Sequence, residues 1–383
     1  EQETGIKWTF ERDKKLKSFF LQNDIHWTEC AYPGVRRGHH DRNQWAKFFR
    51  KDILRYPNLP IIKQSINLGF KNYDLPKIFY DTTPCPNRQK GGSREAEKLL
   101  STFLNSRGEN YQYEMSSPIS AEKSCSRLST HLTYGTISHR SVFQEATQKK
   151  EKIQLTNKNF SKSINSFLSR LHWRSHFIQK LEDQPSIEHE SFIPVYDQIR
   201  EKDFRKLDAW IEGKTGVHFI DACMIYLRNH GWINFRMRAM LASFASYNLW
   251  LDWRYFGPRL AALFTDFEPG IHYSQLQMQS GTTGINTIRM YNPYKQALDQ
   301  DPEAKFIKSQ LPEYNNFPPS FFFKPPELSN NENLFNDSKL ETIVDVTKTA
   351  KFARDKIFSI RKLPEHQKMA KNVFIRHGSR QNR

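Results

Sequence analysis

The sequence predicts a mainly α-helical protein. From Ser93 onward, apolar residues recur at the three-to-four-residue spacing of amphipathic helices almost without interruption. Hydrophobic residues make up only 37% of the chain, but aromatic residues reach 14% and include 29 Phe. Because each aromatic side chain buries a large area, the 383 residues can still form a sizeable core.

The first 60 residues are predicted to form short helices that do not make up a complete domain. A first helix is expected to end at Asn23-Asp24, and Ile25–Thr28 is a short strand candidate. An aromatic helix is expected at Gln44–Leu54. Residues 56–92 are rich in Pro and Asn, which is the composition of a linker.

The remaining chain is expected to form a series of helices with a polar end. Helical spacing predicts helices at 94–105, around Val142, at 161–182, 217–229 and 232–252, and at Ile343–Arg361. The segment 232–252 is the most apolar of them. Residues 363–383 are rich in Lys and Arg and are expected to be a weakly ordered basic tail.

Charge and cysteine content narrow the partners and the compartment. The net charge is +17, from 58 Lys and Arg against 41 Asp and Glu, which favours a polyanionic partner such as nucleic acid. The alternative is an ordinary solvated basic surface. The four cysteines lie far apart, so they suggest neither a metal site nor a disulfide framework, and a reducing, cytoplasmic setting fits. We find no secretion signal, and no apolar run of about 18 residues that would span a membrane.

One short stretch concentrates ionisable groups among aromatic residues. Asp266, Glu268 and His272 lie within seven residues, between Phe264 and a Gln- and Met-rich run. Buried polar groups need partners, so a ligand is one interpretation. The alternative is that the two carboxylates cap a helix that begins near Pro269.

For three arginines, the position on the predicted helix indicates what the guanidinium could bind. Arg174 falls inside the apolar stripe of residues 161–182, so its guanidinium should find a carboxylate or a phosphate in the interior. Arg236 and Arg238 are two positions apart and project from nearly opposite faces of their helix. One could reach an internal ligand and the other an external one; the alternative is that both snorkel from a half-exposed helix.

The order and spacing of six motifs, from about residue 91 to about residue 315, resemble the flavin domain of the DNA photolyase and cryptochrome family. The motifs are Ser126–Ser129, Leu171–Arg174, Gly213–Gly216 with Asp221, Gly231–Arg238, Asp252–Arg254 and Phe264–Gly284. Residues 7–54 resemble the end of that family's α/β antenna domain, whose first part is missing. The resemblance implies an all-α FAD-binding bundle preceded by an antenna remnant. The expected domains are 1–55 (antenna remnant), 56–92 (linker), 93–362 (FAD-binding domain) and 363–383 (basic tail).

The resemblance implies a non-covalently bound FAD, with no antenna chromophore expected on this fragment. Matching positions for the cofactor are Tyr111, Cys125, Ser126, Ser129, Arg174, Arg238, Asp266, Glu268 and His272. Three of these depart from the usual pattern. Cys125 stands where Thr is usual, Glu268 where Asp is usual, and His272 where repair enzymes have the Asn that faces flavin N5.

The resemblance also assigns catalytic and DNA-contacting positions. Trp253 matches the middle of the tryptophan chain that photoreduces the flavin, and with His272 it is the catalytic candidate; Leu276 and Arg200 occupy the chain's other two places. Trp250 or one of several tyrosines could substitute. On the substrate side, Trp173 matches the indole that stacks on a flipped lesion and Arg236 a phosphate contact. Arg170 replaces a carboxylate, Met278 a second stacking Trp and Phe235 an Asn.

The implied function is light-driven repair of pyrimidine dimers in DNA, single- or double-stranded, by electron transfer from reduced flavin to a flipped-out lesion. The alternative is a cryptochrome-like blue-light receptor, or a DNA-binding flavoprotein without repair activity, which His272, Leu276 and Arg170 favour. A third reading, a remnant that no longer folds, conflicts with the nearly complete set of flavin-side residues. We expect a cytoplasmic monomer with no membrane or metal site.

Overall fold

The computed structural model describes residues 3–38, 42–55, 84–325 and 342–378. Within these ranges the chain is helical and has no sheet, only an isolated bridge between Glu201 and Leu251, so the predicted mainly α fold is confirmed. The strand prediction for Ile25–Thr28 is wrong. These residues are irregular and Ile25 is 47% exposed, because an isolated strand has no neighbour to pair with. Most of the predicted linker, residues 56–83, lies outside the described ranges.

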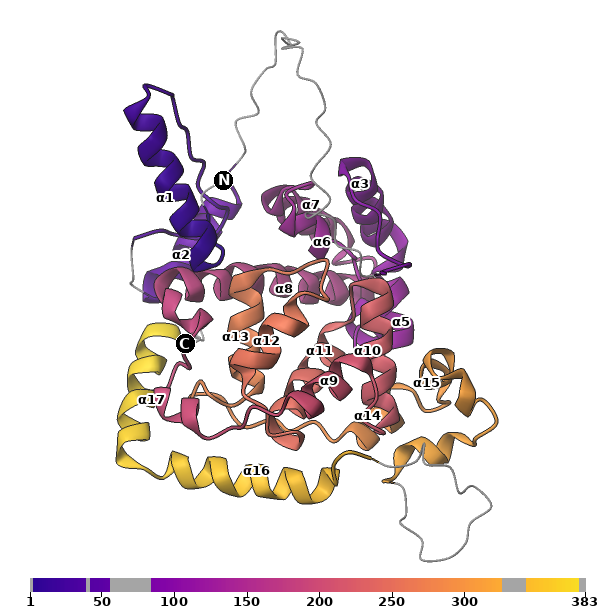
Figure 1. Ribbon diagram of the computed structural model, residues 1–383. Coiled ribbons are helices and arrows are strands. Elements are labelled where there is room, and N and C mark those ends of the chain that lie inside the picture. Colours follow the sequence, from indigo (N-terminus) through magenta and orange to yellow (C-terminus); the bar gives the residue numbers. More distant parts are fainter. Residues whose placement is uncertain (1–2, 39–41, 56–83, 326–341, 379–383) are drawn as a thin grey trace, which may run out of the picture.

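Figure 1 shows the described helices in the order of the sequence. The α-helices are α1 (Lys7–Gln22), α2 (Arg42–Ile53), α3 (Ser93–Thr102), α4 (Tyr111–Glu114), α5 (Pro118–Ser124), α6 (Ser129–Thr133), α7 (His139–Ile153), α8 (Lys158–Asp183), α9 (Phe204–Glu212), α10 (His218–His230), α11 (Phe235–Ser243), α12 (Trp253–Ala261), α13 (Pro269–Gln279), α14 (Pro293–Gln300), α15 (Lys305–Gln310), α16 (Val346–Arg361) and α17 (Pro364–His377). None of these described helices is both long enough and apolar enough to cross a bilayer.

The long helix α8 packs against α7, α13 and α4. Figure 1 shows it running across the molecule, with α7 on one side and α13 on the other. It begins at Asn157, whose side chain accepts a hydrogen bond from the Phe160 amide at 3.0 Å. As far as Leu171 its buried residues recur at helical spacing, which matches the apolar stripe, and from Arg174 to Leu181 every residue is buried.

The most apolar helix is shorter than the sequence predicts. The prediction of a helix over 232–252 is wrong at both ends, because α11 begins at Phe235 and the π-helical turn after it ends at Asn248. The backbone of Asn234 is extended, and its side-chain amide donates hydrogen bonds to the backbone carbonyls of Met115 and Ser116. At the other end, Trp250 has a φ of +56°, a left-handed conformation that no helix accommodates.

The Gly-Lys-Thr-Gly motif, Gly213–Gly216, lies in the loop between α9 and α10, and its hydrogen bonds explain its role in the fold. The buried Asp221 carboxylate accepts hydrogen bonds from the Thr215 amide and hydroxyl and from the Gly216 amide, at 2.7–2.9 Å. Burial raises the pKa of Asp221 to about 6, opposed by these hydrogen bonds. This motif therefore fixes a helix start.

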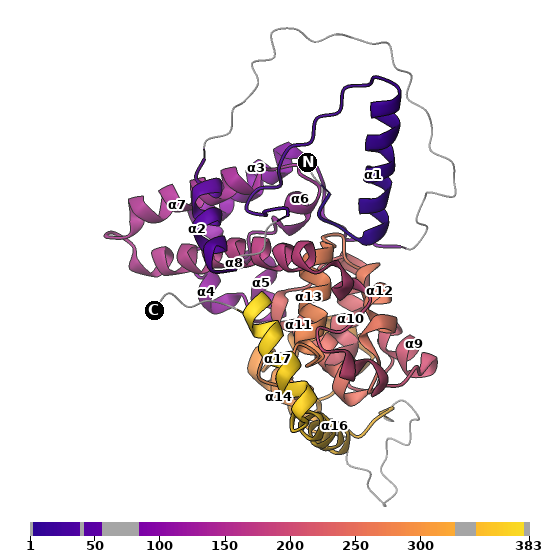
Figure 2. The ribbon, with the colours of Figure 1, turned by 90° about the vertical axis from the view of Figure 1, so that its left-hand side faces the viewer.

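The C-terminal region is more ordered than expected. The prediction of a weakly ordered tail is wrong for Pro364–His377, which form α17; residues 379–383 lie outside the described ranges. Figure 2 shows α16 and α17 following one another along one side of the molecule. His366 contacts the Tyr196 hydroxyl at 2.9 Å, and His377 contacts the Gln184 side chain at 2.7 Å. These side chains recur on one face of α17, a pattern that the high Lys content of the segment obscured.

A single glycine permits the close approach of α13 to α8. A Cβ at Gly270 would lie 2.5 Å from Ile178 Cα, so Gly270→Ala must push the two helices apart. We expect the free energy of unfolding, measured by chemical denaturation, to fall by about 1–3 kcal/mol, although alanine is the better helix former. Gly91→Ala, which has open space around it, is the matched control. Equal stability of the two variants would refute the close approach.

The buried His218 predicts acid sensitivity. Its ring lies 4.5 Å from that of Tyr314 and 5.3 Å from those of Phe321 and Phe322, and burial lowers its pKa to about 4. Because the unfolded chain binds this proton near pH 6.5, stability rises with pH between about 4 and 6.5, by about 3 kcal/mol from this residue. His218→Leu should reduce the pH dependence of the melting temperature in that window. Above pH 7 the pH dependence should be unchanged. An unaltered acid slope would refute the assignment.

Candidate functional site

Two arginine–carboxylate pairs form the centre of the candidate site. Arg174 on α8 donates to the Glu268 carboxylate at 2.8 Å, and both side chains are less than 10% exposed. Arg238 on α11 binds Asp266 through two parallel hydrogen bonds of 3.0 and 2.8 Å. Burial lowers the pKa of Arg174, but the neighbouring Tyr32, Glu268 and Asp266 outweigh it and raise the pKa. The structure therefore brings together residues that are almost 100 positions apart.

The carboxylates do not cap the helix that follows them. Glu268 occupies the N-cap position of α13, but its side chain makes no cap hydrogen bond and instead meets Arg174. The capping interpretation is wrong for this residue, and the prediction that Arg174 finds an interior partner is confirmed. Arg174 also donates to the Tyr32 hydroxyl at 2.9 Å, so the N-terminal segment contributes to the centre.

Arg107, which was not among the predicted site residues, hydrogen-bonds the backbone at the turn Cys125–Ser129. The Arg107 guanidinium donates to the carbonyls of Lys123 and Cys125, both at 2.7 Å, and to that of Ser126 at 3.4 Å. The helix after the turn, α6, is only five residues long, so its dipole adds little for an anion. The Ser126 hydroxyl accepts from the Leu128 amide at 3.4 Å, and Ser129 is the first residue of α6.

Arg127, also missed, lies at the same turn in an unusual conformation. Its φ is +63°, and its guanidinium stacks over the Trp232 ring at 3.7 Å. Its Nη1 is buried and has no hydrogen-bond partner, and the same is true of Arg174 Nε. Arg200 and Arg361 also have a buried nitrogen without a partner. What distinguishes Arg127 as a candidate for binding an acceptor outside the chain is therefore the positive charge gathered at its turn.

Positive charge gathers around Cys125. Burial raises the pKa of its thiol to about 12, opposed by the guanidinium groups of Arg127, Arg107, Arg238 and Arg170. Four guanidinium groups therefore act on one turn. Burial raises the pKa of Tyr111, in α4, and the nearby Arg170 guanidinium opposes this rise. Such a concentration of guanidinium groups suits a ligand with more than one negative charge.

His272 is neutral and has a defined tautomer. Burial lowers its pKa to about 4, and its Nε2 lies 2.9 Å from the Gly257 carbonyl oxygen. A carbonyl oxygen only accepts, so Nε2 bears the proton and Nδ1 is left as an acceptor. The charges of Arg238 and Asp266 also act on this pKa, which places His272 beside the second ion pair.

Three of the predicted substrate-side residues, Arg170, Trp173 and Phe235, lie together at the surface where α8 approaches the start of α11. Arg170 lies 5.5 Å from the centre of the Trp173 ring and 5.7 Å from that of Phe235. Both rings are exposed, by 42% and 48%. Arg236 is half-buried, and its Nε is a buried atom without a partner. Met278 lies on α13 and is partly exposed.

The family profile described as the FAD binding domain of DNA photolyase matches residues 167–359, half of the chain. This chain belongs to the photolyase/cryptochrome family. It is 30% identical over 269 residues to a deoxyribodipyrimidine photo-lyase of Halobacterium salinarum, covering 66% of this chain and 55% of that protein. It is 27% identical over 293 residues to that of Escherichia coli, covering 74% and 59%. The chain thus spans about half the length of these relatives.

Solved structures of family members resemble the whole described fold. An archaeal photolyase from Sulfolobus tokodaii, determined with two FAD molecules, has a TM-score of 0.68 at 26% identity, covering 93% of this chain and 77% of that one. A cryptochrome from Synechocystis has a TM-score of 0.74 at 19% identity, covering 92% and 77%. The latter likeness concerns the fold alone.

The residues that the resemblance assigns to the tryptophan chain lie in the interior of this member of the photolyase/cryptochrome family. Trp253 is buried, and its indole donates to the Ser191 hydroxyl at 3.0 Å. Arg200, which the resemblance places at another position of that chain, is buried too, and its guanidinium donates to the carbonyls of Ser246 and Ser280. Tyr273, whose ring lies 6.3 Å from that of Trp253 and 5.3 Å from that of His272, joins the two catalytic candidates.

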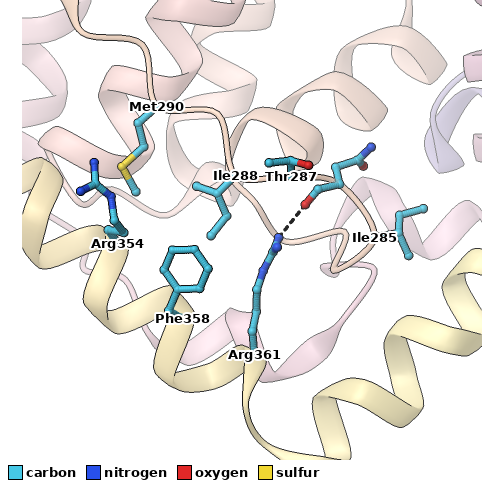
Figure 3. Close-up of a pocket in the computed structure, with 8 residues that line it drawn as sticks. Ile285, Thr287, Ile288, Met290, Arg354, Phe358 and Arg361 are labelled. Atoms are coloured by element: carbon cyan, nitrogen blue, oxygen red, sulfur yellow. Dashed lines mark hydrogen bonds between the residues drawn. The ribbon is translucent and has the colours of Figure 1, made fainter.

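A cavity lies apart from the residues that the resemblance assigns to the site. Figure 3 shows it between α16 and the segment before α14, with a volume of about 550 Å³. It is lined by Ile285, Asn286, Thr287, Ile288, Met290, Arg354, Phe358 and Arg361. The Arg361 guanidinium donates to the Asn286 carbonyl at 2.7 Å and closes one side. None of the predicted site residues lines it.

Proposed function

We propose that the chain binds FAD between α6, α8, α11 and α13. The observations that support this best are the buried Arg127 Nη1 without a partner, at a turn crowded with positive charge, and the buried Arg174 Nε without a partner, on the guanidinium that pairs with Glu268. A dinucleotide with two phosphates supplies the missing acceptors. In this proposal, Arg127, Ser126 and Ser129 hold the phosphates, and Tyr111 and Cys125 pack beside them.

The two ion pairs would orient the redox-active end of the cofactor. When bound, FAD supplies absorption of blue light and an electron that can be donated. Arg238 and Asp266 fix each other through two hydrogen bonds, so both present a defined charge at low conformational freedom. His272 offers an acceptor at Nδ1 while its Nε2 is tied to Gly257, which suits a ligand N–H group. Glu268 neutralises Arg174 and keeps the interior free of net charge.

We further propose that the protein repairs pyrimidine dimers in DNA with light. The photolyase relatives, the basic composition and the exposed Trp173 beside Arg170 support this proposal. The test is a thymine oligonucleotide that contains one dimer, incubated with reduced protein in the dark and under blue light. Loss of the dimer only in the light is the expected result. No loss in the light, with DNA binding intact, would contradict it.

The second candidate function is a blue-light receptor without repair activity. The observation that favours it is the replacement of family positions by arginine, with Arg200 bonded to carbonyls and Arg170 held between two rings. This function predicts a flavin that responds to light but leaves the dimer intact. For either function we propose a cytoplasmic monomer.

A further inference from the structure

The cavity between α16 and residues 285–290 is separate from the site proposed for FAD. Its volume of about 550 Å³ lies within the range of ligand pockets, roughly 300–1,000 Å³. In Figures 1 and 2, α16 lies apart from α8, with α11 and α13 between the two helices. The residues that line the cavity belong neither to the two buried ion pairs nor to the turn Cys125–Ser129, so a ligand bound here has its own set of contacts.

One side of α16 carries two guanidinium groups with an aromatic ring between them. Arg354, Phe358 and Arg361 follow one another at spacings of four and three residues, which places them on the same side of a helix. Figure 3 shows the Phe358 ring between the two arginine side chains, with Ile288 pointing toward it from the facing segment. The Phe358 side chain is 48% exposed, so the ring is available to a ligand.

The charged groups of the cavity are all hydrogen-bond donors. A guanidinium has five N–H donors and no acceptor. None of the described residues that line the cavity is acidic, and in the described part of the chain no ion pair involves Arg354 or Arg361. The Arg361 guanidinium is anchored to the Asn286 carbonyl at 2.7 Å, and its Nε is buried without a partner. The ligand must therefore carry negative charge and acceptor atoms.

The facing segment adds neutral donors and apolar surface. Within the described part of the chain, none of the backbone N–H groups of residues 285–290 donates a hydrogen bond to another backbone group. The Asn286 side-chain oxygen accepts from the Thr283 hydroxyl at 2.8 Å, which leaves the amide nitrogen as a donor. Ile288 and Met290 supply apolar side chains. The ligand must therefore combine its anionic group with an apolar part that also has acceptor atoms.

Two classes of anion meet only some of these requirements. An inorganic anion would engage the guanidinium groups but leave the Phe358 ring uncovered. A fatty acid would cover the ring, but its chain has no acceptor atoms for the N–H groups of residues 285–290. A nucleotide has phosphate oxygens, a flat base, and further acceptors on the edge of that base.

We propose that this cavity binds a nucleotide, with the phosphate on the guanidinium groups of Arg354 and Arg361 and the base against the Phe358 ring. Guanidinium groups pair with phosphate through two hydrogen bonds at once. An aromatic ring stacks on any base, because every base has a flat face. The nucleotide is either free or part of a single strand, and both sources present the same phosphate and base. The inference does not depend on the proposed function.

The test is a titration of the full chain with adenosine 5′-monophosphate (AMP), followed by isothermal titration calorimetry. The chain is first loaded with FAD, and the unbound FAD is removed by gel filtration. Inorganic phosphate is titrated separately. AMP is expected to bind about 5- to 100-fold more tightly than phosphate, which is the contribution of one stacked base. Equal affinities for AMP and phosphate would show an adventitious ion only and would overturn the inference.

Two variants at exposed positions assign the two ends of the ligand. Arg354→Glu should weaken binding of both AMP and phosphate by about tenfold or more, because a donor to the phosphate becomes a negative charge. Phe358→Leu keeps an apolar side chain but removes the flat ring. It should weaken AMP binding by about fivefold or more and leave the affinity for phosphate unchanged. Unchanged AMP binding in Phe358→Leu would exclude a stacked base.

Lys356→Glu is the matched control for charge. Lys356 is exposed on the same helix, but it is two residues from Arg354, so it projects from the other side and does not line the cavity. This variant should keep both affinities within about twofold, because exposed charges at a distance are screened. Equal losses in Arg354→Glu and Lys356→Glu would reduce the effect to general attraction and overturn the inference.

A competition titration distinguishes the two sources of the nucleotide. AMP is titrated in the presence of a saturating single strand of deoxyadenosine, about eight nucleotides long. Loss of AMP binding assigns the cavity to a nucleotide of a strand, and unchanged AMP binding assigns it to a free nucleotide. Either result supports the inference when Arg354→Glu abolishes the AMP signal.

Failure of the proposed function is recognised separately. Arg354→Glu should retain its flavin, and Arg238→Ala should retain its affinity for AMP. A wild-type chain that holds no flavin, but loses AMP binding in Arg354→Glu, contradicts the proposed function and supports the inference. Loss of AMP binding in Arg238→Ala but not in Arg354→Glu would place the nucleotide in the flavin site and overturn the inference.

Discussion

Replacing Glu268 with alanine is expected to lower the free energy of unfolding by about 3–5 kcal/mol, because it leaves the buried Arg174 guanidinium without its carboxylate. The measurement is chemical denaturation of both proteins at pH 7. Removing both charges in Glu268→Ala with Arg174→Met should recover much of the loss, since an apolar side chain can fill a site that a lone charge cannot.

The matched control is Glu303→Ala. Glu303 pairs with Lys305 at 2.7 Å, as short a distance as in the buried pair, but its side chain is 70% exposed. Exposed pairs contribute at most about 1 kcal/mol, so this variant should be nearly as stable as the wild type. Similar losses in the Glu268 and Glu303 variants would show that the interior pair is more hydrated than the structure indicates.

Replacing Arg127 with methionine is expected to weaken FAD binding about 10- to 100-fold, the value of a charged hydrogen bond to a ligand. Methionine keeps an apolar stem over the Trp232 ring but removes the partnerless Nη1. The free energy of unfolding without flavin should fall little or even rise, because a buried positive charge is removed. The measurement is FAD titration followed by protein fluorescence.

The exposed Arg94, at the start of α3, provides the comparison. Arg94→Met removes the same charge from the chain and should leave FAD binding unchanged. If both variants lost affinity equally, general electrostatic attraction would explain the effect, and Arg127 would have no particular place in the site. If neither lost affinity, the phosphates would lie elsewhere.

The interior position of Arg174 could be predicted from the sequence, because one charged residue in an apolar helical stripe is a strong local signal. The pairing of Arg238 with Asp266 could not be predicted from spacing alone and came from the resemblance to a family. Tyr32, Arg107 and Arg127 were missed. Tyr32 reaches Arg174 from 142 positions away, and Arg107 acts on backbone carbonyls, which leave no pattern in a sequence.

The fold was predictable where helices have one apolar face and less so where tertiary contacts decide. The apolar stripe predicted a helix at 161–182, within the observed bounds of α8, but did not show that Asn157 caps its start. The start of α11 depends on hydrogen bonds from Asn234 to a distant turn. Helix α17 is stabilised by buried histidines, which local composition does not distinguish from exposed ones.

The central claim is that this chain holds one FAD between its inward-facing arginines and carboxylates. The most direct test is to denature the purified chain of residues 1–383 and quantify the released flavin by chromatography. We expect FAD at about one molecule per chain when FAD is supplied in excess and the unbound part is then removed by gel filtration, and little or none for Arg238→Ala. A folded wild-type protein that retains no FAD, or an Arg238→Ala variant that retains as much as the wild type, would contradict it.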